Sequence, residues 1–180
     1  MFQKSFAIQF SLNMNIEKTI EFKIIGRVYS RFTEQKGTPI QGRNAPEETA
    51  EIEIFEEYAG GLKDLDGFSH IYVFFKFDRT LENKLLVKPY LDKCERGVFA
   101  TRSPLRPNPL GMTIVRLDRI VRNRLFVSGV DMLNNSPVID IKPYIPDFDH
   151  NQPEKIGWYA ENNSRSEKVL ADDRFERRPE

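Results

Sequence analysis

The stretch FSHIYVFFKF, residues 68–77, indicates the fold class of this chain. Its residues are mainly aromatic and β-branched, a composition that is enriched in strands. The run is also too apolar for the edge of a sheet, so we expect a central strand here.

Shorter segments of strand character lie on both sides of this run. Residues 51–55 alternate acidic and apolar side chains, which is typical of a strand with one buried face. A tight turn at Asn123-Arg124 makes the flanking segments a hairpin candidate. Besides the central strand, we expect strands over residues 22–29, 51–55, 85–90, 97–101, 112–121, 125–130 and 138–144, and a short helix over 62–65.

Many short strands at close spacing, with little helix, predict a mainly β fold: a single small, closed or nearly closed β-barrel with long loops and flexible termini. The 180 residues suffice for one domain with a substantial core. We expect a variable N-terminal arm over 1–18, the barrel over 19–150 and a charged C-terminal tail over 151–180. Residues 160–180 include eleven charged side chains, too many for that segment to fold alone.

Composition excludes several classes of protein and site. Hydrophobic residues make up 39% of the chain, and no apolar run approaches the ~20 residues of a membrane span. Cys94 is the single cysteine, which excludes an internal disulfide and a thiolate-rich metal cluster. With only His70 and His150 as histidines, we expect no metal site. The N-terminus lacks the apolar core of a signal peptide, so we expect a reducing, cytoplasmic setting.

Charge is distributed unevenly although the formal net charge is zero. Residues 47–66 hold eight acidic side chains and one lysine, whereas residues 84–124 hold ten basic and three acidic ones. A local excess of this kind can attract a polyanion such as RNA. The alternative is a solvated basic face that pairs with the acidic segment of the same or a second subunit.

The segment RSPLRPNPLG, residues 102–111, predicts a stiff loop. Its three prolines fix φ near −65° and remove three backbone donors, so the segment is neither helix nor central strand. The loop would hold Arg102, Arg106 and Asn108 at defined angles before a ligand arrives, which lowers the entropic cost of binding. The alternative is a rigid connector whose arginines face water.

Four sequence motifs occur together and in order: DGFSH (66–70), FATRSP (99–104), RPNPLG (106–111) and DIKPY (140–144). In this combination the chain resembles the TrmO family over about residues 24–147. The resemblance implies a β-barrel methyltransferase fold, S-adenosylmethionine as cofactor and a homodimer. It also implies methyl transfer to the exocyclic amine of threonylcarbamoyl-adenosine beside the anticodon of tRNA.

The resemblance carries cofactor contacts onto five places in this chain. They are Gln41, Gly42 and Arg43 in the first, Arg79 and Thr80 in the second, Arg102 in the third, Leu110 in the fourth, and Asp131, Met132, Leu133 and Asn134 in the fifth. Ile40 stands where the family has Arg, and Asn134-Asn135 stand where the family has Asp-Gly. These departures bear on cofactor orientation and on the choice of substrate.

The candidate catalytic residues are Asp131 and Asp140. An adenine amine is a weak nucleophile, so an acceptor that takes or orients its proton helps the transfer. The alternative for Asp131 is a turn cap, and the alternative for Asp140 is an ordinary solvent-facing position on a strand. Candidate substrate contacts are Arg106, Asn108, Lys142 and Tyr144.

The aromatic strand holds further polar and aromatic side chains, namely His70, Tyr72, Phe74 and Phe77. We expect all four to be core residues rather than a base or a stacking platform for RNA. The leading hypothesis is therefore an S-adenosylmethionine-dependent tRNA methyltransferase. Two alternatives stay open: methyl transfer to another acceptor, and a nonenzymatic barrel that binds RNA or another ligand.

Overall fold

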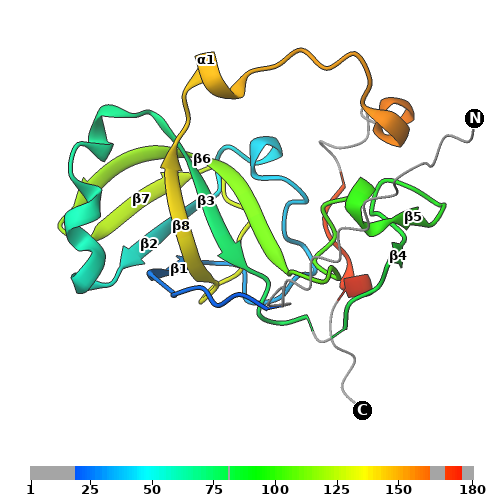
Figure 1. The fold of residues 1–180 in the computed structure, drawn as a ribbon, viewed down its shortest axis with the longest axis horizontal. Coiled ribbons are helices and arrows are strands. Elements are labelled where there is room, and N and C mark those ends of the chain that lie inside the picture. Colours follow the sequence, from blue (N-terminus) through cyan, green and yellow to red (C-terminus); the bar gives the residue numbers. More distant parts are fainter. Residues whose placement is uncertain (1–18, 81, 163–168, 176–180) are drawn as a thin grey trace, which may run out of the picture.

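The computed structural model describes residues 19–80, 82–162 and 169–175. Six antiparallel strands form a closed barrel in the order β1-β2-β7-β6-β3-β8 (Figure 1). These strands are β1 (Gly26–Ser30), β2 (Thr49–Ile54), β3 (His70–Lys76), β6 (Leu110–Val121), β7 (Arg124–Ser128) and β8 (Pro137–Pro143). The prediction of a mainly β fold with a single small barrel is confirmed. The arm expected over residues 1–18 lies outside the described residues.

The barrel core follows the alternation of side chains along each strand. In β3, Ile71, Val73 and Phe75 are buried and the residues between them face outward. The fully buried members of this core are Val28, Ile52, Ile54, Ile71, Val73, Val115, Leu125, Val127, Val130, Met132 and Val138. All are aliphatic or methionine, which is typical of a closely packed apolar interior.

The central strand has one outer face, which the sequence interpretation missed. β3 pairs with both β6 and β8, as a central strand should. However, His70 is exposed, and Tyr72 and Phe74 are half-buried on the outer surface, so the expectation that these three are core residues was wrong. Only Phe77 packs against the barrel core as expected. The barrel closes around one face of β3, which leaves alternate side chains outside.

Strand ends differ from the sequence prediction for identifiable reasons. β1 starts at Gly26 rather than residue 22, because its partners β2 and β8 pair with it only from Gly26 onward. Phe22 and Ile24 are consequently exposed. The β6–β7 turn is Arg122-Asn123, one residue earlier than expected, and the Asn123 side-chain amide donates to the Ile54 carbonyl at 2.7 Å.

Within the described residues, helical structure is confined to short turns. The 3-10 segments are η1 (Gly42–Asn44), η2 (Glu56–Leu62), η3 (Leu65–Gly67), η4 (Val98–Ala100), η5 (Gly157–Glu161) and η7 (Asp173–Phe175), and the single α turn is α1 (Pro146–Asp149). The helix expected over 62–65 is instead split between η2 and η3, because Asp64 adopts a left-handed φ of 64°. No helix within the described part of the chain is long and apolar enough to cross a membrane.

A second, smaller unit lies beside the barrel, and we call residues 84–109 with 169–175 the annex (Figure 1). Its sheet has two strands of two residues each, β4 (Leu86–Val87) and β5 (Arg96–Gly97). The strands expected over 85–90 and 97–101 are therefore much shorter than predicted, since Pro89 lacks a donor and residues 98–100 form η4. A separate core of Val87, Val98, Leu105 and Phe175 holds the annex together.

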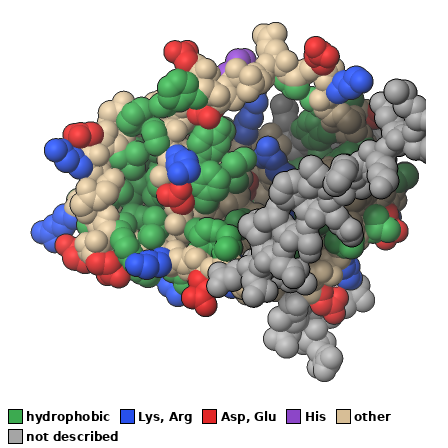
Figure 2. All heavy atoms as spheres, viewed as in Figure 1, with side chains coloured by type: hydrophobic (Ala, Val, Ile, Leu, Met, Phe, Trp, Pro, Cys, Tyr) green, Lys and Arg blue, Asp and Glu red, His purple; other side chains and the backbone are tan. Residues whose placement is uncertain are grey.

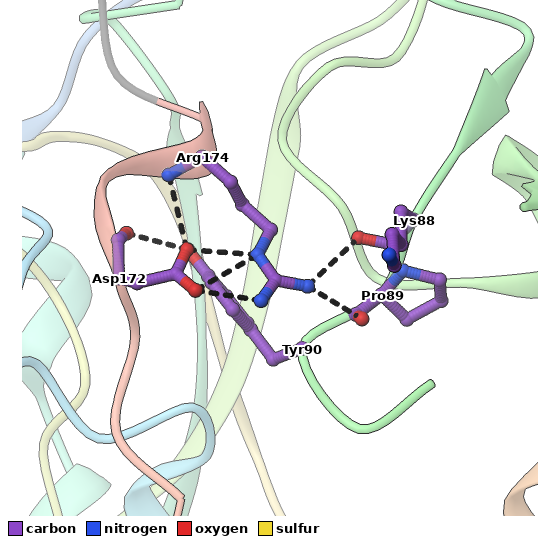
Figure 3. Close-up of polar contacts among 5 residues, drawn as sticks. All are labelled: Lys88, Pro89, Tyr90, Asp172 and Arg174. Atoms are coloured by element: carbon purple, nitrogen blue, oxygen red, sulfur yellow. Dashed lines mark hydrogen bonds and ion pairs between the residues drawn. The ribbon is translucent and has the colours of Figure 1, made fainter. Parts of the chain in front are cut away.

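Residues 169–175 complete the annex from a distant part of the sequence. Phe175 is buried, and the Ala171 backbone exchanges hydrogen bonds with Gly37 and Thr38. The Arg174 guanidinium binds the Asp172 carboxylate at 2.6 Å and the Pro89 carbonyl at 2.8 Å (Figure 3). A segment whose composition predicts an unpacked tail thus contributes to a core.

Candidate functional site

A cleft of about 890 Å³ lies between the barrel and the annex, and we call it the first cleft. The surface is visibly hollowed between these two units, with basic side chains inside the hollow (Figure 2). The barrel contributes Phe75, Phe77 and Asp131, among others, and the annex contributes the proline-rich loop. The long loop over 31–46 supplies one wall, through residues 33–35 and 38–41. A ligand in this cleft would contact both units.

The proline-rich loop is fixed by its backbone as well as by its prolines. The Pro109 carbonyl accepts from the Phe77 N–H at 2.8 Å, and the Leu105 carbonyl accepts from the Lys84 N–H at 2.9 Å. Leu105 itself is buried in the annex core. The loop is therefore attached at two points and packed from behind, which keeps its cleft-facing side chains in place.

Four residues of the loop that sequence reasoning singled out line the first cleft. They are Arg102, Arg106, Asn108 and Leu110. A guanidinium N–H of Arg102 donates to the Gln41 side-chain carbonyl, and Arg106 donates to the Thr101 carbonyl at 3.3 Å. Neither arginine forms an ion pair with the described residues, so both remain available to an anionic group.

Asp131 is the most unusual polar group in the cleft. Its Oδ2 accepts the Gly42 N–H at 2.9 Å, whereas its Oδ1 is buried without a hydrogen-bond partner among the described residues. Burial raises the pKa of the Asp131 carboxyl, and the Thr113 hydroxyl, the Gly42 N–H and the Arg102 charge offset part of this rise. An unpaired buried carboxylate oxygen is costly and indicates a missing partner.

Two glycines make the close packing at this site possible. A Cβ on Gly42 would lie 2.0 Å from the Gly129 carbonyl oxygen, so only glycine lets η1 approach the segment that carries Asp131. A Cβ on Gly111 would lie 2.3 Å from the Phe75 ring, so only glycine leaves room for this ring. Gly42 thus allows a close contact between two backbone segments, and Gly111 allows a close contact between backbone and an aromatic side chain beside the cleft.

Arg79 and Thr80 lie at the far end of the first cleft. The Arg79 guanidinium donates to the carbonyls of Thr33 and Asn134 and so connects the 31–46 loop to the turn after Asp131. The Thr80 hydroxyl donates to the Phe77 carbonyl at 3.1 Å. Arg79 therefore braces the wall of the cleft.

The Asn134-Asn135 pair forms a tight turn shortly after Asp131. Asn135 has a φ of 66°, a left-handed conformation that Asn tolerates better than most residues. The Asn134 Oδ1 accepts the Ser30 N–H at 3.2 Å. This hydrogen bond connects the turn to the end of β1.

Several candidate residues lie elsewhere. Met132 is fully buried in the barrel core, and Asn134 does not line the cleft with its side chain. Arg43 lines only a second cleft, described below. Asp140 and Lys142 form an ion pair at 2.7 Å on β8, and Tyr144 packs against Tyr72 at a ring-centroid distance of 5.7 Å, all outside both clefts.

The structure adds cleft residues that sequence reasoning did not single out. Phe75 and Asp78 come from the end of β3, and Ala171 and Phe175 come from the C-terminal segment. A signal for Phe175 existed, since an isolated aromatic residue within a charged stretch has a reason to be buried. No comparable signal marks Asp78, which becomes a lining residue only through the fold.

The charged side chains of the first cleft are of both signs: Glu34, Asp78 and Asp131 against Arg79, Arg102 and Arg106. Elsewhere, part of the basic stretch is neutralised within the chain, because Arg124 forms ion pairs with Glu51 and Glu53. Among the residues that the structure describes, no cluster of three His, Cys, Asp or Glu side chains could hold a metal ion. A cleft with this lining suits a ligand that carries both positive and negative groups.

Comparison with known proteins identifies the family of this chain. A family model described as the tRNA-methyltransferase O N-terminal domain matches residues 27–150. An S-adenosyl-L-methionine-binding protein of Archaeoglobus fulgidus is 47% identical over 127 residues, which cover 71% of this chain and 91% of that protein. The human tRNA (adenine(37)-N6)-methyltransferase is 36% identical over 135 residues, which cover 71% of this chain but only 31% of that protein.

Solved structures give the same relationship. A crystal structure of TrmO from Pseudomonas aeruginosa matches with a TM-score of 0.65 at 32% identity. The match covers 78% of this chain and 62% of that one, so this chain spans less than two thirds of the crystallised protein. The chain therefore belongs to the tRNA-methyltransferase O (TrmO) family, with the family's N-terminal domain over residues 27–150.

Proposed function

We propose that this chain uses S-adenosylmethionine to methylate the exocyclic amine of threonylcarbamoyl-adenosine next to the anticodon of tRNA. The observation that carries the proposal is the first cleft, which combines arginines, carboxylates and a buried carboxylate oxygen that has no hydrogen-bond partner in the described part of the chain. The names of the relatives, which describe S-adenosylmethionine binding and tRNA methylation at adenine 37, support the same function.

The residues of the first cleft fit the cofactor. S-adenosylmethionine carries a carboxylate, an ammonium, a sulfonium and an adenosine. Arg102 and Arg106 suit the carboxylate, and Asp131 suits a cationic group that would supply the missing partner of Oδ1. Leu110 and Leu133 provide apolar contacts. A volume of about 890 Å³ lies within the range of small-molecule sites.

When bound, S-adenosylmethionine supplies an electrophilic methyl group. The task of the protein is then to align the acceptor nitrogen with that methyl group and to exclude water. The proline-rich loop serves alignment, because its backbone is tied to Phe77 and Lys84. Asp131 is the candidate catalytic residue, since its carboxylate lines the cleft in which the acceptor amine must meet the methyl group. Asp140 lies outside the cleft, so we do not propose it for this role.

Two measurements test the proposal in sequence. Calorimetry should show S-adenosylmethionine binding, and mass analysis of nucleosides should show that tRNA containing threonylcarbamoyl-adenosine gains a methyl group. Absence of binding at millimolar cofactor would favour the nonenzymatic barrel. Binding without methylation of this nucleoside would favour another acceptor.

A matched pair of variants tests the site itself. Arg102→Ala should weaken cofactor affinity by about tenfold or more, because a charge-assisted contact is lost. Arg119→Ala is the control, since this guanidinium lies over the Phe126 ring and outside both clefts. Equal affinities for the two variants would contradict the assignment of Arg102.

We also propose that two copies associate through the outer face of β3, β6 and β8. This outer face carries the side chains of Tyr72, Phe74, Met112 and Ile114. Hydrophobic side chains extend across this face of the barrel (Figure 2). Large exposed apolar patches mark interaction surfaces. Sedimentation should give a dimer for the natural chain and a monomer for Ile114→Glu, whereas a monomeric natural chain would refute the proposal.

A further inference from the structure

We infer that a second cleft receives the acceptor nucleobase and its flanking phosphates, an inference that rests on the function proposed above. This second cleft has a volume of about 730 Å³ and lies on the other side of the Gln41–Arg102 contact. It is lined by Arg43, Trp158 and Tyr159, which do not line the first cleft, and by Phe99, which lines both. Trp158 and Tyr159 lie beyond the family-model match, which ends at residue 150.

The position of the second cleft suits an acceptor. Methyl transfer requires the acceptor nitrogen within about 3–3.5 Å of the methyl carbon, so the base must enter beside the cofactor. The two clefts share several lining residues, among them Ile40, Gln41, Phe99 and Arg102. The two clefts thus adjoin at these side chains, and we place the amine of a base held in the second cleft at this border.

The charge of the second cleft differs from that of the first. Its charged lining residues, among those that the structure describes, are Arg43 and Arg102, and no acidic side chain lines it. The first cleft has three carboxylates along its walls. A cleft with only positive charge favours an anionic ligand such as the phosphates of RNA, whereas the mixed cleft favours the zwitterionic cofactor.

The aromatic residues of the second cleft suit a base that has left its stack. Phe99 lies at the junction of the two clefts with 77% of its surface exposed. Trp158 is fixed by a hydrogen bond from its Nε1 to the Ala100 carbonyl at 2.8 Å and packs edge-on against Tyr159. An unstacked RNA base binds by stacking on such rings, and rings already held in place lose little freedom on binding.

The chain provides its own probe for this inference, because Trp158 is its only tryptophan. The test uses the full chain and an anticodon stem-loop RNA with an unpaired adenosine beside the anticodon. We expect saturable quenching of the Trp158 emission on addition of the RNA. S-adenosylmethionine alone should leave the emission nearly unchanged, because Trp158 does not line the first cleft.

Two substitutions separate stacking from general RNA affinity. Phe99→Leu should weaken RNA binding by about tenfold, the loss expected for one stacking contact. Phe148→Leu is the matched control, since Phe148 is equally exposed at 77% but lies on α1 and lines neither cleft. Arg43→Ala should lower the slope of log affinity against log salt by about one, as expected for a lost phosphate contact.

The outcomes distinguish this inference from the proposed function. RNA methylation without a change in Trp158 emission, or equal losses for Phe99→Leu and Phe148→Leu, would overturn the assignment of the second cleft while the methyltransferase stands. Failure to bind S-adenosylmethionine would overturn the methyltransferase, and RNA-dependent quenching would still support the second cleft as an RNA site. If the Trp158 emission changes with protein concentration in the absence of RNA, a second copy of the chain occupies the second cleft. That result would refute the inference.

Discussion

The barrel and the annex are held together in different ways. Most of the barrel core comes from alternating side chains along paired strands, so most of its buried side chains follow from their neighbours in sequence. The annex core has four buried members, and one of them, Phe175, comes from far along the chain. The barrel is thus a scaffold with redundant support, whereas the annex depends on a few distant contacts. The first cleft, which lies between them, has one rigid wall and one wall of lower stability.

The largest effect should follow a cavity in the barrel. Leu125→Ala should lower the free energy of unfolding by about 4 kcal/mol, because Leu125 is fully buried among strands that close on one another. Urea unfolding followed by far-UV circular dichroism measures this loss. A change below about 1 kcal/mol would mean that the barrel core can collapse around the missing side chain.

Truncation in the annex should have a smaller and more local effect. Phe175→Ala should cost about 3 kcal/mol and speed hydrogen exchange over residues 84–107, while barrel amides keep their protection. Leu170→Ala is the control, because Leu170 is a neighbour with an exposed side chain. If Phe175→Ala loses hydrogen-exchange protection equally in the barrel and the annex, the two units unfold together.

The stability of the chain should depend on pH through Asp131, which lies at the border between the two units. Burial raises the pKa of this carboxyl above its ordinary value of 3.8, so the folded state binds the proton more tightly than the unfolded state. Stability of the natural chain should therefore fall as the pH rises from about 4 towards the raised pKa. Asp131→Asn should lack this fall, which thermal unfolding at a series of pH values measures. A parallel pH dependence of the two proteins would contradict the assignment.

The smallest effect is expected at the contact of Asp172 with Arg174 (Figure 3). This guanidinium lowers the pKa of the Asp172 carboxyl, so the contact stabilises the annex above pH 3.8 and fades as the pH falls through the lowered pKa. Because both groups are partly exposed, Asp172→Asn should cost less than about 1 kcal/mol at pH 7. Asp173→Asn is the control for charge alone, and an equal cost for both variants would show that the specific contact adds nothing.

Periodicity explains why the barrel, more than the annex, could be predicted from the sequence. Residues 51–55 and 112–121 alternate clearly and lie within β2 and β6, apart from Phe55 just after β2. Periodicity did not give the outer position of Tyr72 and Phe74, because a run with aromatic residues at both phases does not show which face is inside. In the annex, the two-residue strands carry no periodic signal at all.

The candidate site was predictable where local chemistry shapes it. Three prolines predict a rigid loop, and the structure places Arg102, Arg106 and Asn108 along the first cleft. The partner of Asp131 and the position of Asp78 depend on strands that meet only in three dimensions, so no local pattern reveals them. The cofactor contacts expected from the family resemblance stay a prediction until binding is measured.

The origin of Phe175 also sets an order of events during synthesis. The barrel can close once β8, which ends at residue 143, has emerged to pair with β1. The annex core can be completed only after residue 175 has emerged. A nascent chain therefore passes through a stage with a finished barrel beside an unfinished binding wall, and its exposed Val87 and Leu105 are then surfaces for a chaperone. Competence to bind a ligand in the first cleft is thus acquired after the barrel has closed, once residue 175 has been synthesised.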